Sequence, residues 1–133
     1  MVYKTAKLKD GRTAMLDWLN ESDLPELVEA LNTVIREEKY LFMNNEITDM
    51  EEERRWFERG IKEGMLYLVA RVDDKIVGGA SIHPRTDKRS HVAGFGVFIR
   101  DGHRNLGLGT MLTNTFTEIA RKRGFEILRF RHD

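Results

Sequence analysis

Hydrophobic positions change their spacing along the chain, and each spacing predicts a different element. After the turn signal Asp10-Gly11, the run Thr13–Trp18 predicts a first strand. Apolar residues then recur at every third or fourth position, which predicts an amphipathic helix. The apolar face of this helix comprises Leu24, Leu27, Val28, Leu31 and Ile35. Ser22 or Asp23 is expected to cap its N-terminus.

A second amphipathic helix is predicted near residues 48 to 61. Thr48 and Glu51 have the spacing of a capping box, and either Gly60 or Gly64 is expected to end the helix. Its apolar positions are Met50, Trp56, Phe57 and Ile61. Between the two helices, the Tyr-Leu-Phe-Met run at 40–43 fits neither period and precedes a pair of asparagines, so we predict a loop there.

From residue 65 the spacing becomes that of strands. Met65–Val72 and Lys75–Ile82 predict two strands joined by a short hairpin turn at Asp73 and Asp74. His91–Ile99 predicts a third. The helical spacing then returns.

A last helix is predicted after residue 107, followed by a last strand. One side of the helix carries Leu108, Leu112, Phe116 and Ile119. Gly124 is expected to end it, after basic residues whose charge suits the last turn. Phe125–Phe130 predicts the final strand.

The order strand, two helices, three strands, helix, strand predicts an α+β fold: a mixed, mainly antiparallel sheet with helices on both faces. A chain of 133 residues with 41% hydrophobic content can build one two-layer core, so residues 1–133 are expected to form a single domain.

Composition excludes several classes of function. The 22 basic and 22 acidic residues cancel, so no basic field is available to attract nucleic acid. The chain has no cysteine, which excludes disulfides, thiolate metal ligands and a cysteine nucleophile. No apolar run approaches the roughly 18 residues of a membrane span, and the charged N-terminus does not resemble a signal peptide. We therefore expect a cytoplasmic protein with no membrane partner.

A candidate anion-binding loop lies between a predicted strand and a predicted helix. Its sequence is Arg104-Asn105-Leu106-Gly107-Leu108-Gly109-Thr110. Gly107 and Gly109 let an anion approach the backbone, and the first N–H groups of a helix lack intrahelical partners. Arg104 can add a charge-assisted contact to a phosphate oxygen. The third glycine of a dinucleotide fingerprint and the Gly-Lys-Ser/Thr of a triphosphate loop are both missing. A diphosphate site without a metal remains, and coenzyme A would suit it.

The run from Gly96 to Leu112 closely resembles the central signature of the GNAT superfamily of N-acetyltransferases, Arg/Gln-x-x-Gly-x-Gly/Ala between the fourth strand and third helix of that family. Residues 68–70 and 76–80 resemble its second and third strands. The resemblance implies an acyl-CoA N-acyltransferase fold and an acetyl-CoA-dependent N-acetyltransferase that acts on a primary amine of a small molecule or protein, without a metal.

The resemblance also implies a coenzyme site. It comprises Val97, Phe98, Ile99, Arg104, Asn105, Leu106, Gly107, Leu108, Gly109 and Thr110. The N–H groups of residues 106–110 would hold the pyrophosphate, and the main chain of Val97 and Ile99 would pair with the pantetheine arm. A backbone N–H near Phe98 would polarise the thioester oxygen while the amine attacks.

Catalytic and acceptor residues are harder to assign. Many relatives carry a glutamate base where this chain has Gly94, so His91 is the best remaining base, followed by His83 and His103. The loop residues Tyr40 and Phe42 are predicted to bind the acceptor. Trp56 and Phe57 are assigned to the core. The run Glu51-Glu52-Glu53 is interpreted as a solvated helix face that could also select a cationic amine.

The C-terminus departs from the family pattern. Relatives continue into a further helix and two strands, whereas this chain stops at Asp133. Three explanations are open: a shorter natural protein, a fragment of a longer one, or a second chain that completes the sheet. An unprotected last strand favours a homodimer. Exchange of strands between the two chains is one way to form it. The alternative function is a non-catalytic acyl-CoA-binding module that has lost its catalytic residues.

Overall fold

The computed structural model describes residues 2–37, 47–84, 92–124 and 126–128. In chain order, the elements are β1 (Val2–Lys7), β2 (Thr13–Trp18), the 3-10 turn η1 (Glu21–Asp23), α1 (Leu24–Glu37), α2 (Met50–Lys62), β3 (Leu66–Val72), β4 (Lys75–Pro84), β5 (Val92–Ile99), α3 (Leu108–Arg123) and β6 (Glu126–Leu128).

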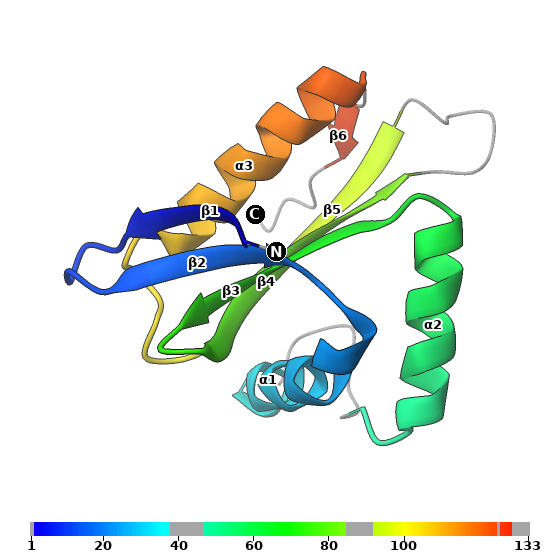
Figure 1. Cartoon of the computed structure of the whole chain (residues 1–133), viewed down its shortest axis with the longest axis horizontal. Helices are drawn as coiled ribbons and strands as arrows, with labels where there is room; N and C mark the ends of the chain where they lie inside the picture. The colour runs from blue at the N-terminus through cyan, green and yellow to red at the C-terminus, as the bar shows by residue number, and fades with distance from the viewer. Residues whose placement is uncertain (1, 38–46, 85–91, 125, 129–133) are drawn as a thin grey trace.

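The strands form one sheet in the order β1-β2-β3-β4-β5-β6. Neighbours are antiparallel from β1 to β5, and β6 runs parallel to β5. The helix α3 covers one face, whereas α1 and α2 lie on the other (Figure 1). The predicted α+β fold, with a mixed and mainly antiparallel sheet between helices, is confirmed.

Two hydrophobic clusters hold these layers together, one on each face of the sheet. Leu68 and Ala70 of β3 face the α3 side, where Phe116 is fully buried, whereas Val69 faces the side of α1 and α2. Successive side chains of a strand point to opposite faces, so β3 contributes to both cores. A strand covered on both faces has an almost continuous apolar sequence, which is why the alternation of β3 is weak.

The edge strand β1 was not predicted, and the expected element order lacked it. Most of its residues are exposed, because it lies at the edge of the sheet and pairs only with β2. A strand with little buried surface has no apolar alternation to detect. Its lysines suit an edge, where charge discourages pairing with other chains. Tyr3 packs edge-to-face on Trp18, with ring centroids 5.3 Å apart.

The predicted caps of the first two helices were wrong by a few residues. Asn20 and Asp23 form a capping box around η1, and α1 continues directly from it. The cap of α2 is Asp49, whose carboxylate accepts hydrogen bonds from the N–H groups of Glu51 and Glu52. Gly60 lies inside α2, and Gly64, with φ of 91°, follows its end. Residues of similar capping ability are adjacent in both segments. The residue types alone therefore do not say which of them caps the helix, and the backbone conformation decides it.

The turns around the functional segment agree with the prediction. Asp73 and Asp74 both have positive φ, as a tight hairpin turn requires. Gly107 and Gly124 flank α3 with φ of 91° and 78°. His91, predicted to open the strand that the structure begins at Val92, lies outside the described residues. The same holds for Phe125, Arg129 and Phe130 of the predicted last strand.

Candidate functional site

The N-terminus of α3 presents free backbone donors to the loop before it. The first intrahelical bond of α3 is donated by Met111 N to Gly107 O over 3.0 Å. The N–H groups of Leu108, Gly109 and Thr110 therefore have no carbonyl one turn earlier in the helix. They lie at the positive end of the helix dipole, so this turn favours an anion.

A cavity of about 290 Å³ opens at this helix end, and we call it the loop cavity. It is lined by Lys9, Ile99, His103, Arg104, Asn105, Gly107, Gly109 and Thr110. A Cβ at Gly109 would meet no atom of the described residues within 4 Å, so glycine leaves open space there. Open space beside free N–H groups and two basic side chains fits a diphosphate.

Lys9 enters the loop cavity from the turn between β1 and β2. Its backbone N–H donates to Leu106 O over 3.1 Å, which ties that turn to the loop before α3. A Cβ built on Gly107 would lie 3.8 Å from Lys9 Cε. The fold thus adds a cation that is almost 100 residues away in the sequence from the glycine motif.

Arg104 lines the loop cavity but is also bound to the protein. Its Nε donates to Ile99 O over 3.0 Å, and Nη2 lies 3.0 Å from Glu37 Oε2 at the end of α1. These contacts place the guanidinium between β5 and α1. Part of its charge is balanced by Glu37, so Arg104 contributes a weaker field to the cavity than a free arginine would.

The C-terminal half of β5 leads away from the loop cavity. β6 pairs with β5 only opposite Val92, Ala93 and Gly94 in the described part of the chain. On that side, residues 95–99 have no strand partner among the described residues, and Val97 is 46% exposed. An extended ligand can therefore hydrogen-bond to this edge as a strand would.

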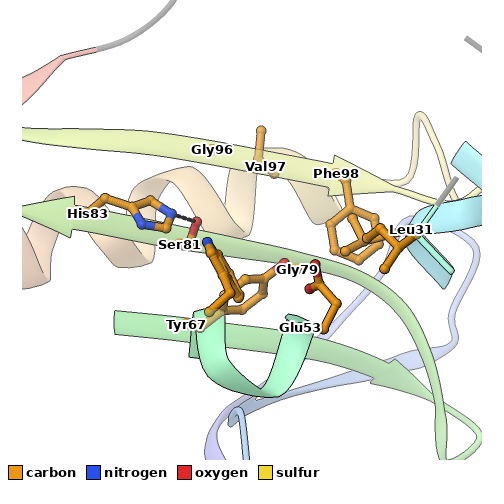
Figure 2. A pocket seen from close by; sticks show the side chains of 11 residues that line it. Leu31, Glu53, Tyr67, Gly79, Ser81, His83, Gly96, Val97 and Phe98 are labelled. Carbon is orange, nitrogen blue, oxygen red and sulfur yellow. Dashed lines mark hydrogen bonds between the residues drawn. The ribbon is translucent and has the colours of Figure 1, made fainter. Parts of the chain in front are cut away.

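A second cavity, of about 430 Å³, lies between β5 and the two helices on the opposite face from α3, and we call it the acceptor cavity. It is lined by Leu31, Ile47, Glu53, Trp56, Tyr67, Gly79, Ser81, His83, Gly96, Val97 and Phe98. Most of this lining is apolar or aromatic. Figure 2 shows the Glu53 carboxylate and the Phe98 ring pointing into the same space from α2 and β5. The cavity therefore suits an apolar molecule with a cationic group.

Three ionisable side chains of the acceptor cavity have shifted pKa values. Partial burial lowers the pKa of His83, although one side of the residue remains exposed. Burial, followed by the charge of Glu52, raises the pKa of Glu53. Burial raises the pKa of the Tyr67 phenol, and the charge of Glu53 adds to that effect. At neutral pH His83 is thus a neutral imidazole and Tyr67 keeps its proton.

The close packing of β4 on β5 shapes this cavity. A Cβ at Gly79 would lie 2.9 Å from Phe98 Cε1 and 3.1 Å from Tyr67 Cε1. A Cβ at Gly78 would lie 2.9 Å from the backbone oxygen of Phe98. Both glycines let β4 approach the Phe98 segment more closely than any other residue would allow.

The model of the Acetyltransferase (GNAT) family matches residues 15–132. The chain belongs to the GNAT acetyltransferase family. The match includes both cavities' strands and the loop before α3, so acetyl transfer is the general activity that this membership supports.

Individual proteins similar to this chain are also acetyltransferases of this family or share its fold. "Probable N-acetyltransferase camello" from Xenopus tropicalis is 32% identical over 65 residues, which is 49% of this chain and 30% of that protein. The chain therefore matches less than a third of that relative's length. The ribosomal-protein-alanine N-acetyltransferase of Brucella melitensis is 26% identical, with a TM-score of 0.75 over 86% of this chain and 72% of that one. The yncA protein of Salmonella typhimurium, solved with its cofactor acetyl-CoA, shares the fold at 18% identity, with a TM-score of 0.75 over 87% of this chain and 68% of that one.

The structure distributes the predicted coenzyme-site residues of this GNAT chain over two cavities and the core. Ile99, Arg104, Asn105, Gly107, Gly109 and Thr110 line the loop cavity, and Val97 and Phe98 line the acceptor cavity. The side chain of Leu108 is buried in the core, and Leu106 packs against it. Only the backbone of Leu108 is available to a ligand, whereas Leu106 is partly buried.

Of the histidines considered as a base, His83 is the one that the structure brings to the acceptor cavity. His103 lines the loop cavity instead, where Arg12 Nη1 lies 3.2 Å from its Nε2. His91 and the predicted acceptor residues Tyr40 and Phe42 lie outside the described residues. For those three positions the assignments stay predictions.

The sequence assigned Trp56 to the core and Glu53 to a solvated helix face that could also select a cationic amine, and the structure places both at the acceptor cavity. Trp56 packs on the core but also lines the acceptor cavity, with its ring 6.2 Å from that of His83. Phe57 is buried, as predicted. The pair Ser81 and His83 could have been noticed, because two polar residues two positions apart in an apolar strand share one face.

The part of the chain that the structure describes contains no cluster of three side chains able to hold a metal. Within the same residues, no helix is long and apolar enough to cross a membrane.

Proposed function

We propose that this chain is an acetyl-CoA-dependent N-acetyltransferase that transfers an acetyl group to a primary amine of a small molecule or protein. One observation carries the proposal: the loop cavity and the acceptor cavity adjoin the same segment of β5, whose edge away from β4 has no strand partner among the described residues. Ile99 lines the first, and Gly96, Val97 and Phe98 line the second. A ligand with a diphosphate at one end and a thioester at the other would follow this edge.

In this proposal, different groups of the chain bind different parts of the coenzyme. The N–H groups of Leu108, Gly109 and Thr110, with Lys9, bind the pyrophosphate. The main chain of Val97 and Ile99 holds the extended arm, and an N–H near Phe98 stabilises charge on the thioester oxygen as the amine attacks. Proximity of the two cavities supplies the orientation that the reaction needs.

The acceptor is proposed to be an amine with an apolar body. Glu53 attracts the ammonium group, because its carboxylate faces a cavity whose other walls are mainly apolar. Trp56 and Phe98 hold the body of the molecule. The likeness to a ribosomal-protein-alanine N-acetyltransferase supports an amine acceptor in general. The homodimer and the cytoplasmic location stay predictions of the sequence.

Calorimetric titration with acetyl-CoA tests the coenzyme site, with Gly109→Val as the blocking variant. A Cβ at this position meets no atom of the described residues within 4 Å, so we expect the new side chain to occupy the open space beside the N–H groups and the fold to be retained. We expect affinity to fall on the order of 100-fold, equivalent to losing two charge-assisted hydrogen bonds. Gly107 is a poorer choice because any side chain at its φ of 91° strains the backbone.

The matched control is Asn114→Val, which places the same side chain on an exposed position of the same helix. It should bind acetyl-CoA as the wild type does. Equal binding by Gly109→Val and the wild type, or no binding by the wild type, would contradict the coenzyme site. Binding without transfer to any amine would instead favour the acyl-CoA-binding module.

A further inference from the structure

Ser81 and His83 form a hydrogen-bonded pair on the wall of the acceptor cavity. Both lie on β4 and, two residues apart, point to the same face. Ser81 Oγ and His83 Nε2 lie 2.8 Å apart, as the dashed line in Figure 2 shows. A Cβ built on Gly96 of β5 would lie 3.7 Å from Ser81 Oγ. The hydroxyl thus stands between the imidazole and the segment of β5 where the thioester is proposed to bind.

We propose that His83 is the proton acceptor of acetyl transfer and that the Ser81 hydroxyl relays the proton to its Nε2 atom. This inference rests on the proposed function. It assigns a catalytic role that neither the glycine motif nor family membership supplies.

The proton and bond changes balance without another reactant. An ammonium N–H bond breaks and its proton passes to Ser81 Oγ, while the hydroxyl's own proton passes to His83 Nε2. The freed nitrogen lone pair forms the C–N bond as the C–S bond breaks. The second nitrogen proton ends on the sulfur through solvent, and the imidazolium returns its proton to solvent. The products are an amide, a thiol and one proton.

The surroundings of His83 favour this role. The Trp56 ring from α2 lies 6.2 Å from the imidazole, tilted by 50°. Partial burial keeps the imidazole neutral at pH 7. The ionisable groups that share the cavity are Glu53 from α2 and Tyr67 from β3. Tyr67 keeps its proton, and Glu53 is positioned to attract the ammonium group. Across β5, Gly94 and Gly96 add no side chain that competes for the proton.

The register of the sheet indicates a second position from which a base could reach the region of the His83 ring. His83 is paired with Gly94 on β5, and directly opposite residues of an antiparallel pair share a face, with Cβ atoms about 5 Å apart. Among the described residues, a Cβ at Gly94 would meet only the backbone oxygen of His83, at 3.9 Å. A carboxylate introduced at position 94 can therefore reach the region that the His83 ring occupies.

The experiment uses two amines of nearly equal shape, 2-phenylethylamine and 2,2-difluoro-2-phenylethylamine. The first is protonated at neutral pH and the second is largely neutral, because fluorine withdraws electrons from nitrogen. Coenzyme A release is measured for the wild type, His83→Gln, Ser81→Ala and Ser81→Thr. Acetyl-CoA affinity, measured by calorimetry, reports folding and should be unchanged.

We expect His83→Gln to lower kcat for 2-phenylethylamine on the order of 100-fold, and to affect the fluorinated amine far less. Glutamine preserves a hydrogen bond to Ser81 but cannot take a proton at neutral pH. Ser81→Ala should resemble His83→Gln, whereas Ser81→Thr keeps the hydroxyl and most of the rate. The wild-type rate should fall in acid, with the fall at a lower pH than for an ordinary imidazole of pKa about 6.5, because burial lowers the pKa of His83.

Adding Gly94→Glu to His83→Gln should restore part of the rate and move its acid limb to lower pH, because a carboxylate is the weaker base. Equal losses with both amines would show a merely structural role and overturn the inference, as would a His83→Gln rate within about twofold of wild type. Full activity of Ser81→Ala would overturn the relay. Binding of acetyl-CoA by a wild type that acetylates neither amine would refute the proposed transferase, and the role of His83 with it.

Discussion

The loop cavity and the acceptor cavity are built in opposite ways. The loop cavity depends mainly on backbone groups of one continuous segment, from Ile99 to Thr110. The acceptor cavity takes its residues from α1, α2, β3, β4 and β5, and from Ile47 before α2. A backbone anion site needs only a glycine motif at a helix start, so neighbouring residues reveal it. A side-chain cavity depends on register and packing, so its residues are scattered along the chain.

The glycines of the two cavities differ in the same way. Gly109 faces open space at the loop cavity, whereas Gly79 is enclosed between Phe98, Leu68 and Tyr67. The first leaves room for a ligand and the second leaves room for the protein itself. Substitution by alanine should therefore separate a binding glycine from a packing glycine.

The largest expected effect on stability is that of Gly79→Ala. A Cβ would lie 2.9 Å from the Phe98 ring and 3.1 Å from the backbone oxygen of Leu68, which cannot move freely. We expect the free energy of unfolding to fall by about 1–3 kcal/mol, as for other overpacked cores. Urea titration measures this change.

Gly109→Ala is the matched control for Gly79→Ala. Alanine favours a helix over glycine by up to about 1 kcal/mol, and nothing obstructs its Cβ. This variant should be at least as stable as the wild type. Similar stability of the two alanine variants would show that the contrast between the glycines is wrong.

Glu53→Gln tests the acceptor cavity with an intermediate effect. Loss of the carboxylate should raise KM for 2-phenylethylamine about tenfold with little change in kcat, because one charge-assisted contact is removed. Acetyl-CoA binding in the loop cavity should not change. Glu52→Gln removes the same charge from an exposed neighbour and should leave KM near the wild-type value. A KM shift shared by both variants would indicate a general field rather than a site.

The smallest effect should appear in the pH dependence of stability. Burial raises the pKa of Glu53, so the folded state binds more protons than the unfolded state. The carboxylate therefore lowers stability as pH rises through its titration range. Thermal unfolding of Glu53→Gln should occur at a slightly higher temperature than that of the wild type at pH 7, and at the same temperature in acid. An unchanged difference between the two proteins across pH would argue against a desolvated carboxylate.

Local patterns determined much of the fold. Helical spacing predicted α1, α2 and α3, because each buries one stripe of apolar residues. Gly107 and Gly124 bounded α3 because glycine readily adopts the left-handed conformation that both positions require. The edge strand β1 escaped prediction because backbone pairing with β2, rather than burial, makes it a strand. Caps were misplaced by a few residues where several capping side chains stood together.

The sequence by itself determined the anion loop, the glycine positions at its helix and the family to which the chain belongs, because adjacent residues carry all three. Only the tertiary structure decided which distant side chains join them. It brought Lys9 to the loop cavity, turned Arg104 toward Glu37, and placed His83 and Ser81 opposite β5. These contacts depend on strand register and on the approach of α2 to the sheet. Both are set by the packing of the whole core, and no short stretch of sequence contains that information.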